Sequence, residues 1–544
     1  MNRPESVPCL IFLLLALCSC AQEPIQLLTR DNDDFDIPEP AKNDEGDYIW
    51  ADGAYLMSMY QAKKMLSPGW ALRKVGVLAE VEAENVNSLD AIPDSTWFTN
   101  RHGLQRVSAE ELVRGPGHQP PNGNWTVVAG KQIGRNPGFI AQHEDGRLLF
   151  VKFDPGNFPG MGTNGDVIVS KFLHSAGYNV PEYYAVRLSR DALELSPTAE
   201  IPGQYGAKRP MTEVDLAALL DAAPQLGDGT VLANVSIGIP GKVKGPFEFF
   251  GTRDDDPNDT VLHENRRELR GLGLFMAWFN NTDQRRGNTL DTYVEENGRR
   301  FLRHYILDFS GSFGSLNDLP KLSANGHEYA IDPEMIFRSA IGLGVWVRRW
   351  ESVTAPTFSS VGYFESDSFD PETWRSIYPN PAFEKITERD AYWATKIITS
   401  FTDKDIRRIV ATGFFPEPAQ QEYVVRQIIL RRNIIGRRFL NHSRISPLDR
   451  FSVQLRADHK PQLQFDDLAV ERGYADQSKT RYRYRVNDGD FVEMDSLALE
   501  LPHGYEGQQI EIQTSRHGDN DWGPSVSVWI TRRDGEPKVV RIDR

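Results

Sequence analysis

A lysine within an apolar strand pattern is the first residue with chemical potential. Residues 148–153 form an expected strand, in which side chains alternate between the two faces, so that Leu148, Phe150 and Lys152 share one face. Such a lysine is either an edge side chain that extends its ammonium into solvent or a partly buried ammonium with an anionic partner. Asp166, at the expected start of the next helix, could be that partner. The alternative for Asp166 is an acid that only stabilises the first helical turn.

Two further acidic motifs follow in the second half of the chain. Residues 283–288 (Asp-Gln-Arg-Arg-Gly-Asn) come directly after a helical pattern, and residues 305–311 contain Asp308. Between the motifs, two strand-like segments flank the turn Glu296-Asn297-Gly298, which is typical of a hairpin. The hairpin is expected to return Asp308 to the side of Asn288.

The elements that must position these residues predict an α+β fold. Strand patterns are followed by one helix and another strand, at 125–128, 139–142, 148–153, 166–175 and 183–188. An antiparallel sheet with one inserted helix is the arrangement of a kinase amino-terminal lobe. Helical periodicity dominates later, at 263–280, 390–401, 403–412 and 421–440. Residues 446–544 show period-2 alternation and regular turns, which predict a small antiparallel β-sandwich of the immunoglobulin or fibronectin-III type.

The order of the motifs resembles the protein-kinase-like superfamily over about residues 125–440. The resemblance consists of Lys152, an acid, Asp283-x4-Asn288, a hairpin and Asp308-Phe309. It is closer to the atypical branches, such as HipA-like toxin kinases and phosphoinositide-type kinases, because residues 280–282 replace the usual His-Arg. The chain also resembles a family of bacterial lipoproteins, whose signature would include residues 245–247, 251–255 and 266–271.

The resemblance implies a nucleotide site. Lys152 would hold the α- and β-phosphates of ATP, and Asp166 would orient the lysine. Lys131 and Gly134, in the glycine-containing loop between the first two strands, are the other candidate nucleotide-binding residues. The loop lacks the regular glycine spacing of the superfamily, and Asp166 is one carbon shorter than the usual glutamate.

The resemblance also implies a catalytic and metal site. Asp283 would accept the proton of an attacking hydroxyl, and Asn288 and Asp308 would ligate Mg²⁺. Phosphoryl transfer needs cations on the phosphates, oxygen ligands for a hard metal and a carboxylate near the nucleophile. The implied activity is transfer of a phosphoryl group from Mg-ATP, or another donor, to a hydroxyl. The alternatives are a catalytically silent pseudokinase-like scaffold and a purely structural envelope lipoprotein.

Composition excludes several classes of protein. The chain has 544 residues, of which 76 are acidic and 61 are Lys or Arg, for a net charge of −15. A nucleic-acid partner is not expected, because phosphate binding requires a basic face. With 40% hydrophobic and 10% aromatic residues, the chain is globular rather than disordered.

The amino terminus predicts export and a lipid anchor. The apolar run 10–17 is too short to span a bilayer but fits the core of a signal peptide. Residues 17–20 (Leu-Cys-Ser-Cys) resemble a lipobox, with Cys20 as the lipidated residue; the alternative is a plain secretory signal cut near Ala21. The remaining cysteines, Cys9 and Cys18, lie in the same segment, so the body has no disulfide. The expected location is the bacterial envelope, in the outer membrane, with the body in the periplasm or at the cell surface.

These patterns divide the chain into six expected segments. They are a signal peptide (1–20), a solvated acidic and proline-rich spacer (21–47), a mixed segment (48–121), an amino-terminal lobe (122–250), a helical lobe (251–445) and the β-sandwich (446–544). The membrane is the expected partner through Cys20, and an envelope protein or glycan is the expected partner of the β-sandwich.

Three other groups of residues have competing interpretations. The acidic run 254–259 is either a Ca²⁺ loop or, because the required Gly and Glu are missing, a loop anchored by Arg253. Three arginines either contact phosphates or form a solvent-facing helix surface: Arg266, Arg267 and Arg270. His304 lacks metal-ligand spacing and is expected to be a packed strand residue.

Overall fold

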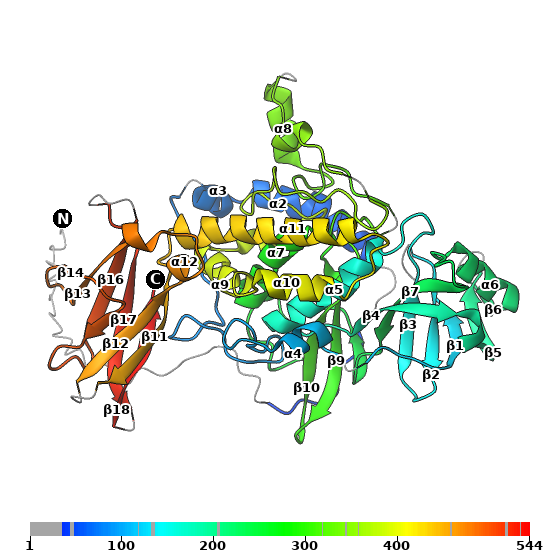
Figure 1. The fold of residues 1–544 in the computed structure, drawn as a ribbon, viewed down its shortest axis with the longest axis horizontal. Coiled ribbons are helices and arrows are strands. Elements are labelled where there is room, and N and C mark those ends of the chain that lie inside the picture. The colour runs from blue at the N-terminus through cyan, green and yellow to red at the C-terminus, as the bar shows by residue number, and fades with distance from the viewer. Residues whose placement is uncertain are drawn as a thin grey trace, which may run out of the picture.

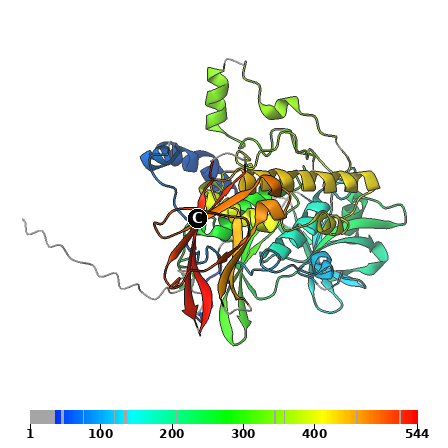
Figure 2. The same ribbon diagram turned by 60° about the vertical axis from the view of Figure 1, so that its left-hand side comes forward.

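The structure, a computed structural model, has three regions in a row (Figure 1). It describes residues 35–43, 48–74, 76–117, 119–131, 136–203, 207–317, 319–342, 345–356, 358–456, 460–516, 521–533 and 535–544. A β-rich region lies at one end, helices fill the centre, and the carboxy-terminal strands lie at the other end (Figures 1 and 2). The predicted mixed α+β class is confirmed. The predicted lipidation residue Cys20 and the loop residue Gly134 lie outside the described residues.

The first region is a seven-stranded sheet with the strand order β4-β7-β3-β2-β1-β5-β6. Its strands are β1 (Trp125–Gly130), β2 (Gly138–His143), β3 (Leu148–Lys152), β4 (Tyr183–Ser189), β5 (Leu193–Pro202), β6 (Lys208–Pro210) and β7 (Thr230–Ile237). All neighbouring pairs are antiparallel except β1 and β5, which are parallel. Strand β7 lies between β3 and β4, which places its side chains next to those of β3.

The two faces of β3 have different surroundings, as the alternation predicts. Leu149 and Val151 are buried in a core that also receives Leu216 from helix α6 (Glu213–Ala222). Leu148 and Phe150 stay 41% and 39% exposed on the opposite face. Lys152 belongs to that second, open face, which is where a ligand could reach it.

Helix α5 (Met161–Ala176) follows β3 and corrects the sequence prediction. The helix begins five residues before Asp166, so Asp166 is not its first-turn acid. The glycines in the run 160–165 suggest a loop, but the residues after Gly160 are helical. Gly160 itself is the N-cap, with φ +86°. Asp154 supplies the cap instead, because its carboxylate accepts the backbone N–H groups of Gly162 and Thr163. Asp166 therefore projects from the interior of the helix.

The central region is a helical core. Its helices are α4 (Ala109–Arg114), α7 (Arg267–Phe279), α9 (Glu388–Ile398), α10 (Asp403–Val410) and α11 (Pro418–Gly436), which continues as a π-helical turn (Arg437–Asn441). Ser108, Thr387 and Thr402 each form a capping box at a helix start. The expected helix at 263–280 starts later, because His263–Asn265 forms a 3₁₀ turn.

Peripheral helices surround this core. An amino-terminal group comprises α1 (Tyr48–Tyr55), a π-helical turn (Leu56–Tyr60), α2 (Gln61–Met65) and α3 (Pro68–Lys74). Helix α8 (Pro333–Ile341) extends away from the body at the top of Figure 1. Among the described residues, no helix is both long enough and apolar enough to cross a membrane.

The arginines at the start of α7 are buried, which corrects both interpretations of them. They are at most 1% exposed: Arg266, Arg267 and Arg270. Arg267 pairs with Asp90 at 2.8 Å and with Asp390 at 3.2 Å. These two acids are distant in the sequence, so the spacing of residues within the helix could not predict them as partners. It points only to the nearby Glu264 and Glu268. The arginines connect the mixed segment to helix α9 and contact neither solvent nor the candidate phosphate site.

A three-stranded sheet carries the predicted hairpin. Strands β8 (Lys242–Gly245), β9 (Thr289–Glu296) and β10 (Arg299–Ile306) pair in the order β10-β9-β8, and Ile306 faces Thr289 in the register. The described part of the expected spacer, residues 35–43, packs on this sheet. Ile37 is 0% exposed and its N–H donates to the Arg300 carbonyl at 3.0 Å. The prediction of a solvated spacer is therefore wrong for Ile37 and Pro40, which are buried, while residues 35, 36, 38, 39, 41 and 42 are exposed.

The carboxy-terminal region consists of two sheets around one apolar core. The strands are β11 (Leu448–Leu455), β12 (Pro461–Asp467), β13 (Arg481–Val486), β14 (Val492–Met494), β15 (Ala498–Glu500), β16 (Gln509–Ser515), β17 (Ser525–Arg533) and β18 (Glu536–Asp543), with a short helix α12 (Leu468–Glu471). Arg544 joins this region to the centre, because its side chain is 1% exposed and pairs with Asp90 at 2.9 Å and Asp449 at 3.0 Å.

Candidate functional site

Lys152 lies between two carboxylates. Its Nζ is 3.5 Å from Asp166 Oδ2 and 3.4 Å from Asp308 Oδ2. The lysine side chain is 20% exposed, while Asp166 is fully buried and Asp308 is 37% exposed. The interpretation of Lys152 as a partly buried ammonium with an anionic partner is therefore confirmed. Despite its shorter side chain, Asp166 reaches the lysine from the interior of α5.

Asp166 connects three elements. Its Oδ2 accepts a hydrogen bond from Asn234 Nδ2 on β7 at 2.7 Å, and its Oδ1 accepts the Phe309 N–H at 2.6 Å. Asn234 also faces Lys152 directly in the β3–β7 register. Helix α5 approaches the Phe309 backbone so closely that a Cβ on Gly165 would lie 2.3 Å from the Phe309 carbonyl oxygen. One carboxylate thus fixes the lysine and the loop that carries Asp308.

The charges of this cluster oppose the cost of burial. Burial alone would lower the pKa of Lys152, but Asp166 and Asp308 outweigh it and raise that pKa above its usual value. Burial raises the pKa of Asp166 despite Lys152. Burial would also raise the pKa of Asp308, yet Lys152 and the Ser310 hydroxyl lower it. Lys152 is thus a fixed cation and Asp308 a fixed anion at neutral pH.

The hairpin brings Asp308 beside the 283–288 loop, as predicted. The Leu307 N–H donates to the Asn288 carbonyl at 2.8 Å, and Asn288 Nδ2 donates to the Asp283 carbonyl. Asp308 adopts φ 53°, which lies in the left-handed region and turns its side chain toward Lys152. The structure therefore brings together the predicted residues of both acidic motifs and of the lysine strand.

Asp283 is a buried carboxyl group with a nearby cation. Burial raises its pKa, the Arg285 guanidinium opposes that shift, and the Asp308 carboxylate adds to it. Arg285 Nε is 3.3 Å from Asp283 Oδ1, and the Asp283 side chain is 22% exposed. A raised pKa makes a carboxylate a better proton acceptor, provided that it remains ionised at the working pH.

Lys131 is a second cation at the site. Its Nζ donates to the Asn136 carbonyl at 2.7 Å. Burial, together with the Lys152 ammonium, lowers its pKa to about 8, and Asp308 and Asp166 oppose that shift. The pair of lysines beside two aspartates fits the predicted nucleotide-binding role of Lys131.

The residues present fit a hard divalent cation. Asn288 uses its Nδ2 internally, and among the described residues no hydrogen bond engages its Oδ1. Asp308 uses Oδ1 for the Ser310 hydroxyl at 2.5 Å and keeps Oδ2 on the Lys152 side. Oxygen ligands from one carboxylate and one amide suit Mg²⁺, which fills its other positions with phosphate and water. Within the described part of the chain, no group of three or more His, Cys, Asp or Glu forms a metal site without such additions.

Several site residues are absent from the sequence prediction. Asn234 is a buried polar residue between apolar ones on β7, a signal that could have found it. Asn317 Oδ1 accepts the Ser310 hydroxyl at 2.7 Å. Lys321 is buried and donates to the carbonyls of Gly311, at 2.7 Å, and Asn280, so it joins the two acidic loops. The polar environment of the last two residues depends on distant backbone groups and leaves no local pattern.

Asp154 gives the site a pH-dependent stability that we expect to be measurable. Burial raises its pKa to about 6, although the Thr163 hydroxyl and the backbone N–H groups at the start of α5 lower it. The folded state therefore binds this proton more tightly than the unfolded state does, and stability falls as pH rises from about 4 to 6. In Asp154→Asn, the unfolding free energy should lose this part of its pH dependence, about 2–3 kcal/mol across the window. Urea unfolding of both proteins at pH 4.5 and 7.5 tests it, and a constant difference between them would contradict the assignment.

Two of the other sequence candidates are structural. The Arg253 N–H donates to Asp259 Oδ2 at 2.7 Å and its Nε bonds Asp255 at 2.7 Å, so Arg253 anchors the acidic loop as predicted. His304 is buried on β10, where it stacks on Trp97 with ring centroids 3.5 Å apart and bonds Asp291 at 2.7 Å. The packed-strand interpretation of His304 is confirmed.

Comparisons with known proteins find kinases among solved structures. One is the crystal structure of a Helicobacter pylori proinflammatory kinase, CtkA, at TM-score 0.29 and 11% identity, covering 57% of this chain and 95% of that chain. Another is the Golgi casein kinase, at TM-score 0.23 and 10% identity, covering 70% of this chain and 96% of that chain. No family model and no curated protein sequence matches the chain. Likenesses at these TM-scores do not establish a function.

Proposed function

We propose that this protein is a phosphotransferase that moves a phosphoryl group from Mg-ATP, or a related donor, to a hydroxyl acceptor. The observation that supports it is the convergence of Lys152, Asp166 and Asp308 within 3.5 Å contacts, beside the loop of Asp283 and Asn288. Phosphoryl transfer depends mainly on positioning and charge neutralisation, and this set offers both.

The residues divide the work as follows. Lys152, with Lys131 nearby, binds the α- and β-phosphates, and Asp166 orients Lys152. Asn288 and Asp308 would hold Mg²⁺, which when bound neutralises charge that develops on the phosphates. Asp283 accepts the proton of the acceptor hydroxyl. The exposed Leu148 and Phe150 on the Lys152 face offer an apolar surface for a nucleotide base.

A second candidate is a catalytically silent scaffold. It is favoured by the internal neutralisation of the two acidic residues, since Arg285 pairs with Asp283 and Lys152 pairs with Asp308. A scaffold would keep these pairs closed and would bind no nucleotide. In both cases we propose an exported protein with a lipid on Cys20 in the bacterial envelope, with the carboxy-terminal strands as the contact for an envelope protein or glycan.

Nucleotide binding separates the two candidates. ATP at 100 times its Kd, with Mg²⁺, should stabilise the wild-type protein by about 2.7 kcal/mol in a thermal-shift measurement. Asp308→Asn should lose the Mg²⁺-dependent part of this shift, because the metal loses its carboxylate. Asp221→Asn, an exposed acid on α6, is the matched control and should behave as wild type. Equal shifts with and without Mg²⁺ in wild type would contradict the metal assignment, and the absence of any shift would favour the scaffold.

A further inference from the structure

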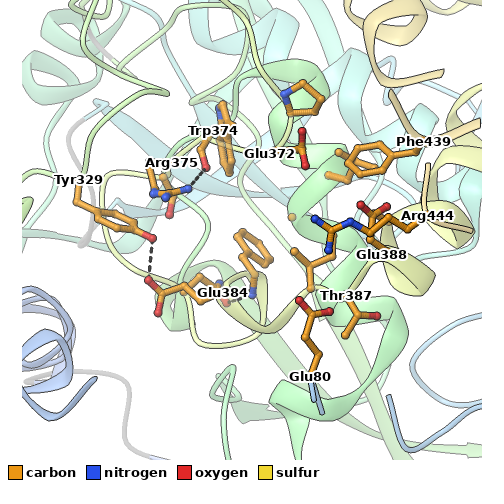
Figure 3. A pocket seen from close by; sticks show the side chains of 18 of the residues that line it. Glu80, Tyr329, Glu372, Trp374, Arg375, Glu384, Thr387, Glu388, Phe439 and Arg444 are labelled. Atoms are coloured by element: carbon orange, nitrogen blue, oxygen red, sulfur yellow. Dashed lines mark hydrogen bonds between the residues drawn. The ribbon is translucent and has the colours of Figure 1, made fainter. Parts of the chain in front are cut away.

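A cavity of about 380 Å³ is linked to the 283–288 loop through Asn380, which lines the cavity and donates to the Gln284 carbonyl. Its walls come from the amino-terminal segment, from α7, from residues 371–391 and from the end of the π-helical turn after α11. Its size is that of a small-molecule site. Four aromatic side chains line it, as Figure 3 shows in part: Tyr329, Trp374, Phe383 and Phe439.

Most charges of the cavity are neutralised internally. Glu384 accepts a hydrogen bond from Tyr329 at 2.8 Å (Figure 3). It accepts another from Tyr60 at 2.8 Å and pairs with Lys64 at 2.6 Å. The next two acids of the wall also have a cation, since Glu372 and Glu388 share Arg438 at 2.6 Å and 2.5 Å. Two carboxylates thus share the single charge of Arg438, and Arg444, which also lowers the pKa of Glu372 after Arg438, supplies the second positive charge.

Two lining residues keep their charge available. Within the described residues, neither Arg375 nor Glu80 forms an ion pair. The Arg375 side chain only donates to the Trp374 carbonyl at 3.2 Å and stacks on Tyr329. The cavity therefore presents one guanidinium group for an anion, one carboxylate for a cation, and aromatic surfaces between them.

The wall of the cavity also holds the catalytic loop. We name residues 374–380 the strap. Three hydrogen bonds join the strap to the residues on both sides of Asp283: Trp374 Nε1 to Asn280 Oδ1 (3.0 Å), the Ile377 N–H to the Thr282 carbonyl (2.7 Å) and Asn380 Nδ2 to the Gln284 carbonyl (3.3 Å). Trp374 and Asn380 line the cavity as well. A molecule in the cavity would therefore contact the side chains that position Asp283.

We propose that this cavity binds a small zwitterion, with a carboxylate and an ammonium on an apolar body, and that its occupancy tightens the strap on the catalytic loop. Arg375 receives the carboxylate, Glu80 receives the ammonium, and the aromatic side chains cover the body. Apolar α-amino acids have this chemistry and a size that the cavity admits. The effect on turnover rests on the proposed phosphotransfer, whereas the binding does not.

The test uses the full chain and L-phenylalanine as the probe. Calorimetry should show saturable binding, and two analogues that each lack one charge, L-phenylalaninamide and 3-phenylpropanoate, should bind roughly tenfold more weakly or worse. Arg375→Gln and Glu80→Gln should weaken L-phenylalanine binding by a similar factor. Arg426→Gln and Glu110→Gln, exposed residues outside the cavity, are the matched controls and should change nothing.

Hydrogen exchange measures the coupling without nucleotide or acceptor. Saturating L-phenylalanine should slow exchange of the Ile377 and Asp283 amides by roughly tenfold, because the strap and the loop open together. Glu80 is exposed, so Glu80→Gln is expected to fold normally, and it should need roughly tenfold more L-phenylalanine for the same protection. The absence of saturable binding, or equal binding by the analogues or by both variants, would overturn the site. Binding without any change in exchange would overturn the coupling, and neither result depends on phosphotransfer.

Discussion

Asp283→Asn should lower phosphotransfer turnover by roughly 10²–10⁴-fold while nucleotide affinity stays the same. The amide cannot accept the proton of the acceptor hydroxyl, but it has the shape of the carboxyl group and leaves Lys152 and Asp308 in place. The measurement is label transfer from ATP to an envelope extract, together with nucleotide titration of each protein. Asp221→Asn serves again as the matched control.

The same residue predicts a pH profile. Burial raises the pKa of Asp283, against the opposing Arg285, and the base works only when it is ionised. Wild-type turnover should therefore fall as pH is lowered through that raised pKa, and the residual turnover of Asp283→Asn should not show this fall. Equal turnover in the two proteins, or a fall that persists in the variant, would remove Asp283 from the reaction.

Arg267→Met should be the most destabilising single change outside the site, by about 3–5 kcal/mol. The methionine fills much of the volume but leaves Asp90 and Asp390 buried with fewer cations, 2% and 0% exposed respectively. Urea unfolding followed by tryptophan fluorescence gives the free-energy difference. Arg187→Met is the matched control, since its pair with Asp228 is exposed on both sides and is worth less than about 1 kcal/mol.

Acid should reduce the difference in unfolding free energy between the wild-type protein and Arg267→Met. Burial would raise the pKa of Asp90, but Arg267 and Arg544 outweigh it and lower the pKa to about 2. The stability from this carboxylate is present above about pH 4 and is lost as pH falls toward 2. The cost of Arg267→Met should therefore shrink on acidification. A cost below 1 kcal/mol at pH 7 would show that the buried pairs only compensate their own desolvation.

Local patterns predicted most of the elements but not their neighbours in space. The hairpin of β9 and β10 and the capped helix α4 follow from turn and capping residues that lie within a few positions. The place of β7 between β3 and β4 does not, because strand order is a long-range property of the sheet. Asn234 reaches Asp166 only through that order, so sequence spacing could not identify the pair.

The same contrast between local patterns and long-range contacts applies to the candidate site. The sequence predicted the convergence of four residues, because their order along the chain indicates one arrangement of loops: Lys152, Asp283, Asn288 and Asp308. The predicted start of α5 was wrong because the helix is capped by Asp154, which lies several residues before its first turn. Sequence patterns for capping do not reach that far. The prediction for the arginines at the start of α7 was wrong because Arg267 and Arg270 pair with acids that lie more than a hundred residues away, Asp90 and Asp390. Only Arg266 pairs with acids close in the sequence.

The position of Asp166 has a consequence for how the protein could be controlled. The same carboxyl group receives the Phe309 N–H and the Asn234 amide, and Gly165 leaves no room between α5 and Phe309. Movement of the Asp308 segment away from α5 would break the contacts with Phe309 and leave the buried Asp166 carboxylate with fewer hydrogen bonds. We therefore expect the candidate site to form during folding and to stay formed. The supply of substrates and distant effectors would then set the rate of phosphotransfer, rather than a rearrangement of the site itself.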